Sequence, residues 1–518
     1  MKNRRKLKLQ ASSIRTILVV AILVCIGIRF AWLSFDFGSL HEDPDAYKAL
    51  AEGYATSGTF GRLNSSGVVT ATAYRPPALV WLLSWFVVDS KLSDLAVGLL
   101  NWFFGGVTCC LVSRITFLLS GNLLTAAFAC FCVAIDPILL KQSSQAMTET
   151  LATLVAVSLW WGWIELNTKS RTPSKYSVWM LTLGLIAGAG CLVRPTTIVW
   201  IACWFVLSLV SLLGPRMWRS FAERKATMGK QSTERPLILS GKRAIEMSRH
   251  ESKLRSTNDV DEPRGPAQRF QAWLFFLLGM ACVVTPWGYR NAVQIGRWTM
   301  TTTHGGYTIL LANNPVLYEN IRVHGWDRHW DETRFHLLWD QRRREDPREL
   351  EYWNRSEVDF SKALTQPPKE FHFGENGEHH EVSDDRLASD VAWKTISSNP
   401  STFIKSCFVR TSWFWALTPY RAGVSGISSR AIGVWYSFLY LCFFLSLGSL
   451  LRERLHKRLR VNRLLLWTPA VALAFSLMLV HAIYWSNMRM RAPLMPSLYV
   501  FVFVRLTDVY SQSATTKS

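Results

Sequence analysis

The sequence lacks the local motifs of several large protein classes. It contains no C-x-x-C pair, no G-x-x-x-x-G-K-[ST] phosphate loop, no G-x-G-x-x-G turn and no internal repeat of solenoid period. These absences exclude a zinc ribbon, a c-type haem and the common nucleotide-binding loops. The ten cysteines lie in or beside apolar segments, where we expect them to be small core residues.

Charged residues are scarce, at 18% of the 518 residues, whereas 49% are hydrophobic. The mean hydropathy is +0.12, and the apolar residues lie in long uncharged runs. This pattern excludes cytosolic and nuclear roles and predicts an all-α polytopic membrane protein. The formal net charge of +21 comes from short basic clusters between the apolar runs. Because these clusters form no single groove with interleaved aromatics, we expect no nucleic acid partner.

Ten apolar runs are long enough to cross a hydrocarbon core of about 30 Å, so a bundle of about ten (10 to 13) transmembrane helices is predicted. They lie near residues 14–35, 94–118, 122–140, 147–166, 176–193, 195–213, 270–289, 430–451, 464–485 and 492–508. The run at 76–88 is too short to cross and is expected to form a re-entrant or interfacial helix. The segment at 403–419 contains Lys405 and Arg410 and is expected to lie on the membrane surface.

The number of Lys and Arg residues in each loop predicts which side of the membrane that loop faces. With the N-terminus inside, the loops assigned to the cytoplasm hold 27 Lys and Arg, and the short external loops hold eight. Both termini are therefore expected to be cytoplasmic. Five regions are predicted. Residues 1–213 form an N-terminal transmembrane catalytic module with an external loop at 36–93, and residues 214–269 form a basic cytoplasmic linker. A transmembrane helix at 270–289 leads to an external hydrophilic region at 290–429, a small α-rich or mixed domain, and C-terminal transmembrane helices follow at 430–518.

Five arginines remain at the predicted outer boundary, against the general preference for basic residues inside. Most lie within two residues of a proline or in a tight local motif, which fixes the chain and so aims the guanidinium group. They are Arg75, Arg194, Arg290, Arg489 and Arg491. Together they predict an anion held at the outer leaflet, although snorkelling to lipid headgroups also explains any one of them.

Acidic residues occur at the same predicted boundary. Asp43 and Asp45 precede a short helix predicted by the spacing that begins at Tyr47. We expect Asp45 to cap this helix, which leaves Asp43 as the better catalytic carboxylate. Glu149 lies at the start of the apolar run near 147–166. A carboxylate at this position is favoured by the helix dipole, or it belongs to a functional site. No spacing typical of a metal site occurs, so none is predicted, although Asp43 and Asp45 leave a divalent cation possible.

In their order along the chain, these motifs resemble those of the GT-C superfamily of membrane glycosyltransferases. The nearest branch is the bacterial one related to protein O-mannosyltransferases and lipid A aminoarabinose transferase. The motifs are Asp43-x-x-x-Tyr47, Tyr74-Arg75-Pro76-Pro77, Pro137 leading to Thr148-Glu149, Arg194-Pro195, Pro286-Trp287 with Arg290-Asn291, and Arg491-x-Pro493-x-x-Pro496. The chain departs from the frequent Asp-Glu pair by having Pro44 after Asp43, which leaves open whether Asp45 replaces the second acid.

The resemblance implies a GT-C-like bundle in the bacterial inner (plasma) membrane. It implies transfer of a sugar from a polyprenyl-phosphate donor to an acceptor hydroxyl of a protein, glycolipid or polysaccharide on the outer side. It also implies a catalytic role for Asp43, phosphate binding by Arg75, and a family counterpart for Glu149. The residues fit this chemistry, because a hydroxyl nucleophile needs a carboxylate to accept its proton and arginines stabilise a departing phosphate.

Two other functions are compatible with many membrane spans. A lipid-linked-sugar flippase or secondary transporter would hold its ionisable residues near mid-bilayer on broken helices, whereas here they gather at one face. A noncatalytic scaffold would be insensitive to Asp43→Asn, which distinguishes it from an enzyme.

Overall fold

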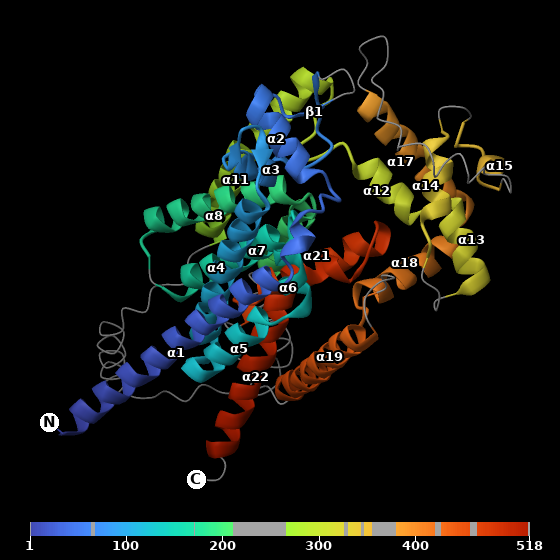
Figure 1. Ribbon diagram of the computed structural model, residues 1–518. Helices are drawn as coiled ribbons and strands as arrows, with labels where there is room; N and C mark the ends of the chain where they lie inside the picture. The colour runs from blue at the N-terminus through green and yellow to red at the C-terminus, as the bar shows by residue number, and fades with distance from the viewer. Residues whose placement is uncertain are drawn as a thin grey trace, which may run out of the picture.

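The computed structural model describes most of the chain as helices (Figure 1). The described residues are 2–63, 68–169, 171–210, 266–325, 330–342, 346–354, 380–419, 426–455 and 464–515. The basic linker predicted at 214–269 therefore lies outside the described residues, apart from 266–269.

Helices from the N-terminal half pack side by side, with one of them at the centre. They are α1 (Lys2–Phe35), α4 (Asp94–Ser120), α5 (Leu123–Ala134), α6 (Pro137–Ser143), α7 (Glu149–Thr168), α8 (Pro173–Val193) and the helix Thr196–Val210. The central helix is α7, which contacts α4 and α8 and buries its side chains on nearly every side. Because α7 faces protein rather than lipid, it can carry Glu149 and Glu165 in a buried position.

The apolar run predicted at 122–140 forms a bent pair of helices rather than one continuous helix. Helices α5 and α6 are bent by 56° at Asp136 and Pro137. Pro137 takes the first helical position of α6, and Asp136 caps it by accepting a hydrogen bond from the Leu139 amide.

The C-terminal helices complete the bundle. They are α11 (Pro266–Ile295), α19 (Gly426–Leu455), α21 (Thr468–Ile483), the 3-10 helix η2 (Met488–Leu494) and α22 (Met495–Thr515). Helix α11 lies along α8, and the close contact depends on glycine: a Cβ atom at Gly184 would lie 2.0 Å from the Phe276 carbonyl oxygen, and one at Gly188 would lie 2.8 Å from that of Met280. Glycine at these two positions therefore lets the backbones of α8 and α11 approach closely.

Six of the described helices are long and apolar enough to cross a membrane, or seven if the bent pair counts as one span. The other three predicted spans are helices too, but Thr196–Val210 and α21 are shorter, and α7 contains three tryptophans and two glutamates that lower its hydropathy. The chain is thus an all-α polytopic membrane protein, and the number of ten spans stays a prediction.

The loop after α1, which we call the external loop after its predicted side, adds short elements at one end of the bundle. They are η1 (Phe37–Leu40), α2 (Tyr47–Ser57), β1 (Gly61–Leu63), β2 (Val69–Ala71), α3 (Pro77–Ser84), β3 (Val87–Val88) and β4 (Lys91–Leu92). Strands β1 and β2 pair antiparallel with Arg62 opposite Thr70, and β3 pairs with β4. With eight residues, α3 is about 12 Å long, so it is too short to cross a membrane.

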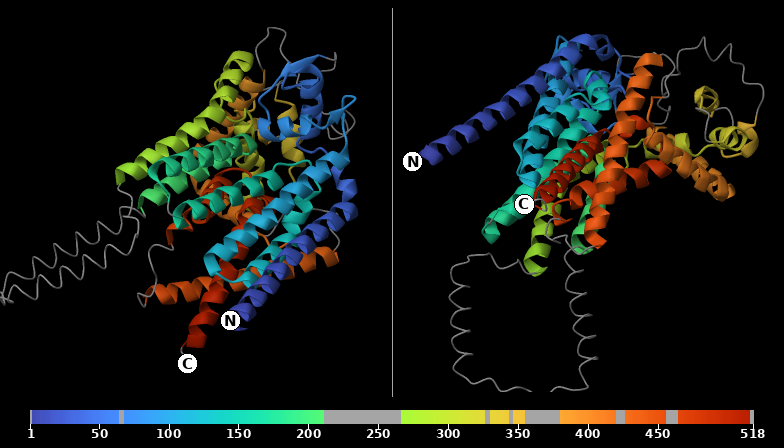
Figure 2. Two further views of the ribbon diagram at one scale, coloured as in Figure 1. Left: turned by 90° about the vertical axis from the view of Figure 1, so that its left-hand side faces the viewer. Right: turned by 90° about the horizontal axis from the view of Figure 1, so that it is seen from below.

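A second group of helices lies beside this end (Figures 1 and 2). It consists of α12 (Gly305–Ala312), α13 (Pro315–His324), α14 (Thr333–Asp340), α15 (Leu350–Trp353), α17 (His380–Ser398) and α18 (Pro400–Phe414). The group has its own apolar core, which includes Leu310, Phe335 and Trp353. Glu381 of α17 joins it to the external loop by accepting hydrogen bonds from Ala73, at 3.0 Å, and from Thr72.

The start of α1 and the end of α22 lie at the same end of the bundle, opposite α2, α3 and β1 (Figures 1 and 2). This arrangement separates the termini from the external loop by the length of the helices. Helix α18 was expected on the membrane surface; one of its faces packs against α21, where Arg410 is fully buried.

Candidate active site

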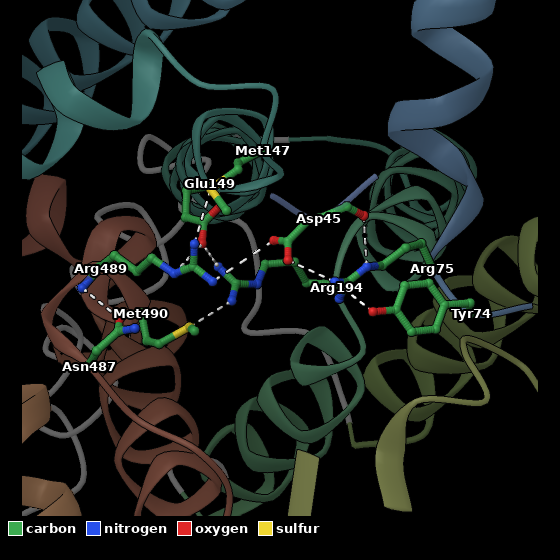
Figure 3. Close-up of polar contacts among 9 residues, drawn as sticks. All are labelled: Asp45, Tyr74, Arg75, Met147, Glu149, Arg194, Asn487, Arg489 and Met490. Carbon is green, nitrogen blue, oxygen red and sulfur yellow. Dashed lines mark hydrogen bonds and ion pairs between the residues drawn. The ribbon is translucent and has the colours of Figure 1, made fainter. Parts of the chain in front are cut away.

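Five ionisable side chains from distant parts of the sequence meet beside the external loop (Figure 3). They are Asp45, Arg75, Glu149, Arg194 and Arg489. Each comes from a segment boundary: the loops before α2 and α3, the first residue of α7, the end of α8 and the start of η2. We call these five residues the ion-pair cluster.

Arg75 binds Asp45 in a well-defined geometry. Its Nη2 lies 2.7 Å from Asp45 Oδ1, and its Nε donates to the Asp45 carbonyl oxygen at 3.0 Å. The guanidinium also lies 4.4 Å from the centre of the Tyr74 ring. Burial alone would lower the pKa of Arg75, but Tyr74 and Asp45 raise it above its usual value. Arg75 is therefore a fixed positive charge, aimed by the extended Pro76 that follows it.

Glu149 and the other two arginines are held less tightly. Glu149 Oε1 lies 3.4 Å from Arg194 Nη1 and 3.6 Å from Arg489 Nε, and Arg489 Nη2 lies 3.9 Å from Asp45 Oδ2. Arg489 thus bridges the two carboxylates. These separations exceed the usual hydrogen-bond length, and within the described chain Arg194 Nη1 and Arg489 Nε have no hydrogen-bond acceptor.

Arg194 and Arg489 each donate one hydrogen bond to a methionine sulfur atom. Arg489 Nη1 lies 3.1 Å from the Met147 sulfur, and Arg194 Nη2 lies 3.0 Å from the Met490 sulfur (Figure 3). A thioether is a weak acceptor, so it compensates a buried guanidinium poorly. With three guanidinium groups against two carboxylates, the cluster has a net positive charge and donors able to bind an additional anion.

The N-cap residue of α2 is Ala46, and Asp43, the predicted catalytic acid, bonds to the first turn of the helix, which corrects the expectation that Asp45 would cap it. Asp43 Oδ2 accepts a hydrogen bond of 3.0 Å from the Ala49 amide, whereas Asp45 faces Arg75. The left-handed backbone of Ala46, with φ of 60°, turns the chain between Asp45 and the helix. Asp43 Oδ1 is buried and has no hydrogen-bond partner among the described residues. Only Pro44 separates Asp43 from Asp45, so their Cα atoms lie within about 7 Å.

Two of the five predicted arginines lie outside the ion-pair cluster. Their guanidinium N–H groups donate hydrogen bonds to backbone carbonyl oxygens instead. Arg290 donates to the carbonyl oxygens of Phe60, at 2.5 Å, and Thr72, at 2.7 Å. Arg290 therefore ties α11 to the external loop rather than facing a carboxylate of the cluster.

Arg491 is the second arginine outside the cluster and is fully buried. It donates to the carbonyl oxygens of Phe414, at 2.7 Å, and Ala416, at 2.8 Å, and its guanidinium lies 4.6 Å from the centre of the Tyr436 ring. Its neighbours thus belong to α18 and α19.

A buried polar network that the sequence did not predict lies near Arg491. Asp136, at the break between α5 and α6, accepts hydrogen bonds from Tyr499, at 2.7 Å, and Tyr436, at 3.2 Å. In the sequence, Asp136 is distinguished only by the proline that follows it. Its tyrosine partners come from α19 and α22, some 300 residues later, and no local pattern links them.

A small, partly open apolar cavity adjoins the ion-pair cluster. Arg194 lines it, together with Ala152 and Val155 of α7, and Leu473 and Leu477 of α21. A second small cavity shares part of this wall and continues along α7 and α21. Its lining is contributed by helices far apart in the sequence, so the sequence alone gave no sign of it.

The side chains that could act as metal ligands in the described ranges do not fit a metal centre. Within the described ranges, no three His, Cys, Asp or Glu side chains come together to hold a metal ion. Asp45, one of the two residues considered for a divalent cation, is already paired with Arg75, whose charge would oppose a cation there. We therefore assign no step to a metal.

Comparison with known proteins gives structural matches only. No protein-family model matches the chain, and no curated protein matches it in sequence. The chain is similar to ArnT from Cupriavidus metallidurans, solved with undecaprenyl phosphate, at 13% identity over 95% of this chain and 78% of ArnT, with a TM-score of 0.38. ArnT is an aminoarabinose transferase.

The chain is also similar to the archaeal oligosaccharyltransferase AglB from Archaeoglobus fulgidus, solved with an inhibitory peptide and a dolichol-phosphate. Here the identity is 13% over 98% of this chain, and the TM-score is 0.48. The chain spans about half the length of AglB, at 51%.

Proposed function

We propose that this protein transfers a sugar from a polyprenyl-phosphate donor to an acceptor hydroxyl. The observation that carries the proposal is the position of Arg194, which belongs both to a cationic cluster with unsatisfied donors and to the wall of an apolar cavity. A lipid phosphate has these two properties, an anionic head and an apolar tail. The arginines would bind the phosphate, and the cavities along α7 and α21 would receive the first part of the tail.

Asp43 is the proposed general base. One of its oxygens is fixed by the Ala49 amide, and the other is buried without a partner in the described chain, so it can accept a proton. As the hydroxyl oxygen of the acceptor bonds to the anomeric carbon, its proton passes to Asp43. The bond between that carbon and the phosphate oxygen breaks, and its electron pair leaves with the phosphate.

The arginines of the cluster would stabilise this leaving group. Phosphate gains negative charge as the bond breaks, and Arg75, Arg194 and Arg489 offer charge-assisted hydrogen bonds to it. Asp45 and Glu149 would hold these guanidinium groups in position before the donor binds. An in-line displacement of this kind inverts the anomeric centre.

The proposal extends to the setting of the reaction. The external loop and the cluster would lie on the outer side of the bacterial inner membrane, with both termini in the cytoplasm. The acceptor would be a protein, a glycolipid or a polysaccharide that presents a hydroxyl at that surface.

The base is tested by Asp43→Asn, which keeps a side-chain oxygen for the bond from the Ala49 amide but cannot accept a proton. In proteoliposomes with a labelled polyprenyl-phosphate sugar, we expect kcat to fall by about 10²–10⁴, with undecaprenyl phosphate binding unchanged. The control is Asp331→Asn, since Asp331 also accepts a helix amide, that of Thr333, but lies away from the cluster. Unchanged turnover in Asp43→Asn would overturn the assignment of the base.

A lipid-linked-sugar flippase or transporter is the second candidate, and one observation favours it. Asp136 is a buried ionisable residue at the break of a bent helix pair, as expected at a transport site. A flippase would move the labelled lipid across the proteoliposome bilayer without forming a glycosylated product. The same assay therefore separates the two functions.

A further inference from the structure

His481 near the end of α21 has one ring nitrogen without a partner. Its side chain is buried, with 5% of the residue exposed, and its Nδ1 lies 2.9 Å from the carbonyl oxygen of Trp485. A carbonyl only accepts hydrogen bonds, so Nδ1 must carry the hydrogen. In the neutral ring, Nε2 is then an acceptor, and no residue of the described chain donates to it.

Two contacts fix the orientation of this ring. Besides the bond to Trp485, the ring stacks on Phe414 with a centroid separation of 5.8 Å and an interplanar angle of 20°. The two ring nitrogens point in diverging directions, so Nε2 faces away from the Trp485 carbonyl. Arg194 and Arg489 lie near enough for their charges to act on the ring. With its Nδ1 hydrogen donated to the Trp485 carbonyl, the neutral ring keeps a lone pair on Nε2.

The helical spacing puts His481 one turn beyond the stretch of α21 that lines the apolar cavity. Leu473 and Leu477 line the cavity, and His481 continues their stripe one turn further along α21. On the neighbouring helix α7, Ala152 lines the cavity, and Glu149 of the ion-pair cluster lies one turn beyond it. His481 and Glu149 thus occupy corresponding positions, each one helical turn beyond a residue that lines the cavity.

We propose that Nε2 of His481 accepts a hydrogen bond from a sugar hydroxyl of the donor. This inference rests on the proposed transfer from a lipid-linked sugar and adds a residue that selects its substrate. A phosphate diester carries no hydrogen to donate, so the arginines and not His481 hold the phosphate. The partner of Nε2 must be a donor near that phosphate, and the sugar hydroxyl next to the phosphate-bearing carbon meets this requirement.

Two amide substitutions separate the functions of the two ring nitrogens. In His481→Gln the amide group reaches about as far as Nε2 and offers an oxygen acceptor there. In His481→Asn the shorter amide group replaces Nδ1 and can only keep the bond to Trp485. Neither amide can accept a proton at neutral pH, so both variants would lose a general base equally.

The experiment measures sugar transfer in proteoliposomes. The donor is the pool of lipid-linked sugars extracted from membranes of the native host after deletion of the gene. We expect His481→Asn to lower kcat/KM at least about tenfold and His481→Gln to stay within about threefold of the wild type. Both variants should bind undecaprenyl phosphate as the wild type does, because this lipid has no sugar hydroxyl.

Three outcomes would overturn the inference: wild-type activity in His481→Asn, equal losses in the two variants, or weakened undecaprenyl phosphate binding in either of them. The second would indicate a base or a packing role, and the third a structural role. If the wild type itself transfers no sugar from the pool, the proposed function fails, and that result is visible before any variant is compared.

Discussion

At the scale of single residues, the arginines near the external loop differ in what their donors contact. Arg75, Arg194 and Arg489 face carboxylates, whereas Arg290 and Arg491 donate to backbone carbonyls. All five stand out in the sequence, because each lies at the end of an apolar run. Their division into two groups depends on which backbone segments pack against them, and a local motif does not contain that information.

The two aspartates of the external loop show a similar limit. The residues Asp43 to Tyr47 predict a capped helix, and α2 begins at Tyr47 as expected. The backbone of Ala46 decides which aspartate bonds to the first turn of α2. Its left-handed conformation turns the chain so that Asp43 reaches the Ala49 amide. Alanine rarely adopts this conformation, so the sequence favoured the wrong cap.

Arg491 provides a prediction at the residue scale. Arg491→Leu would leave the Phe414 and Ala416 carbonyls unpaired and remove the buried cation over Tyr436. We expect a loss of roughly 1–3 kcal/mol in stability, because two buried carbonyl oxygens lose their donor, measured as a lower thermal unfolding temperature of the purified protein in detergent. Arg322→Leu is the control, since Arg322 is an exposed partner of Glu319, and it should change stability by less than about 1 kcal/mol. Equal stability of the two variants would contradict the structural role of Arg491.

At the scale of elements, apolar length predicted the positions of the helices well. Each of the ten predicted runs contains a helix, and the short run at 76–88 contains α3. The run at 122–140 differs, because Pro137 ends one helix and begins another at an angle of 56°. Glycines let α8 and α11 pack closely, but no local pattern identifies α11 as the partner, because the two helices lie far apart in the sequence.

Gly184 provides a prediction at the element scale. Gly184→Ala would bring a Cβ atom within 2.0 Å of the Phe276 carbonyl oxygen, so α8 and α11 must move apart. We expect a destabilisation of about 1–3 kcal/mol, measured by thermal unfolding in detergent. Gly448→Ala in α19 is the matched control, since nothing lies within 4 Å of its added Cβ atom. A Gly184→Ala variant as stable as Gly448→Ala would contradict the close α8–α11 contact.

At the scale of the whole molecule, the candidate site depends on contacts between segments as far apart as Asp45 and Arg489. The order of motifs along the chain predicted that these segments belong together, through resemblance to a family and not through local chemistry. The termini and the external loop lie at opposite ends of the bundle (Figures 1 and 2). This agrees with a chain whose ends share one side of the membrane, and the cytoplasmic assignment of that side stays a prediction.

The central claim, that the cluster binds a lipid phosphate, is tested most directly by the affinity for undecaprenyl phosphate. The measurement is native mass spectrometry of the detergent-solubilised protein, with the double variant Arg194→Gln and Arg489→Gln compared with the surface variant Arg322→Gln. We predict a loss of at least about 100-fold in affinity for the double variant, equivalent to two charge-assisted hydrogen bonds, and none for the control. Wild-type affinity in a correctly folded double variant would contradict the claim.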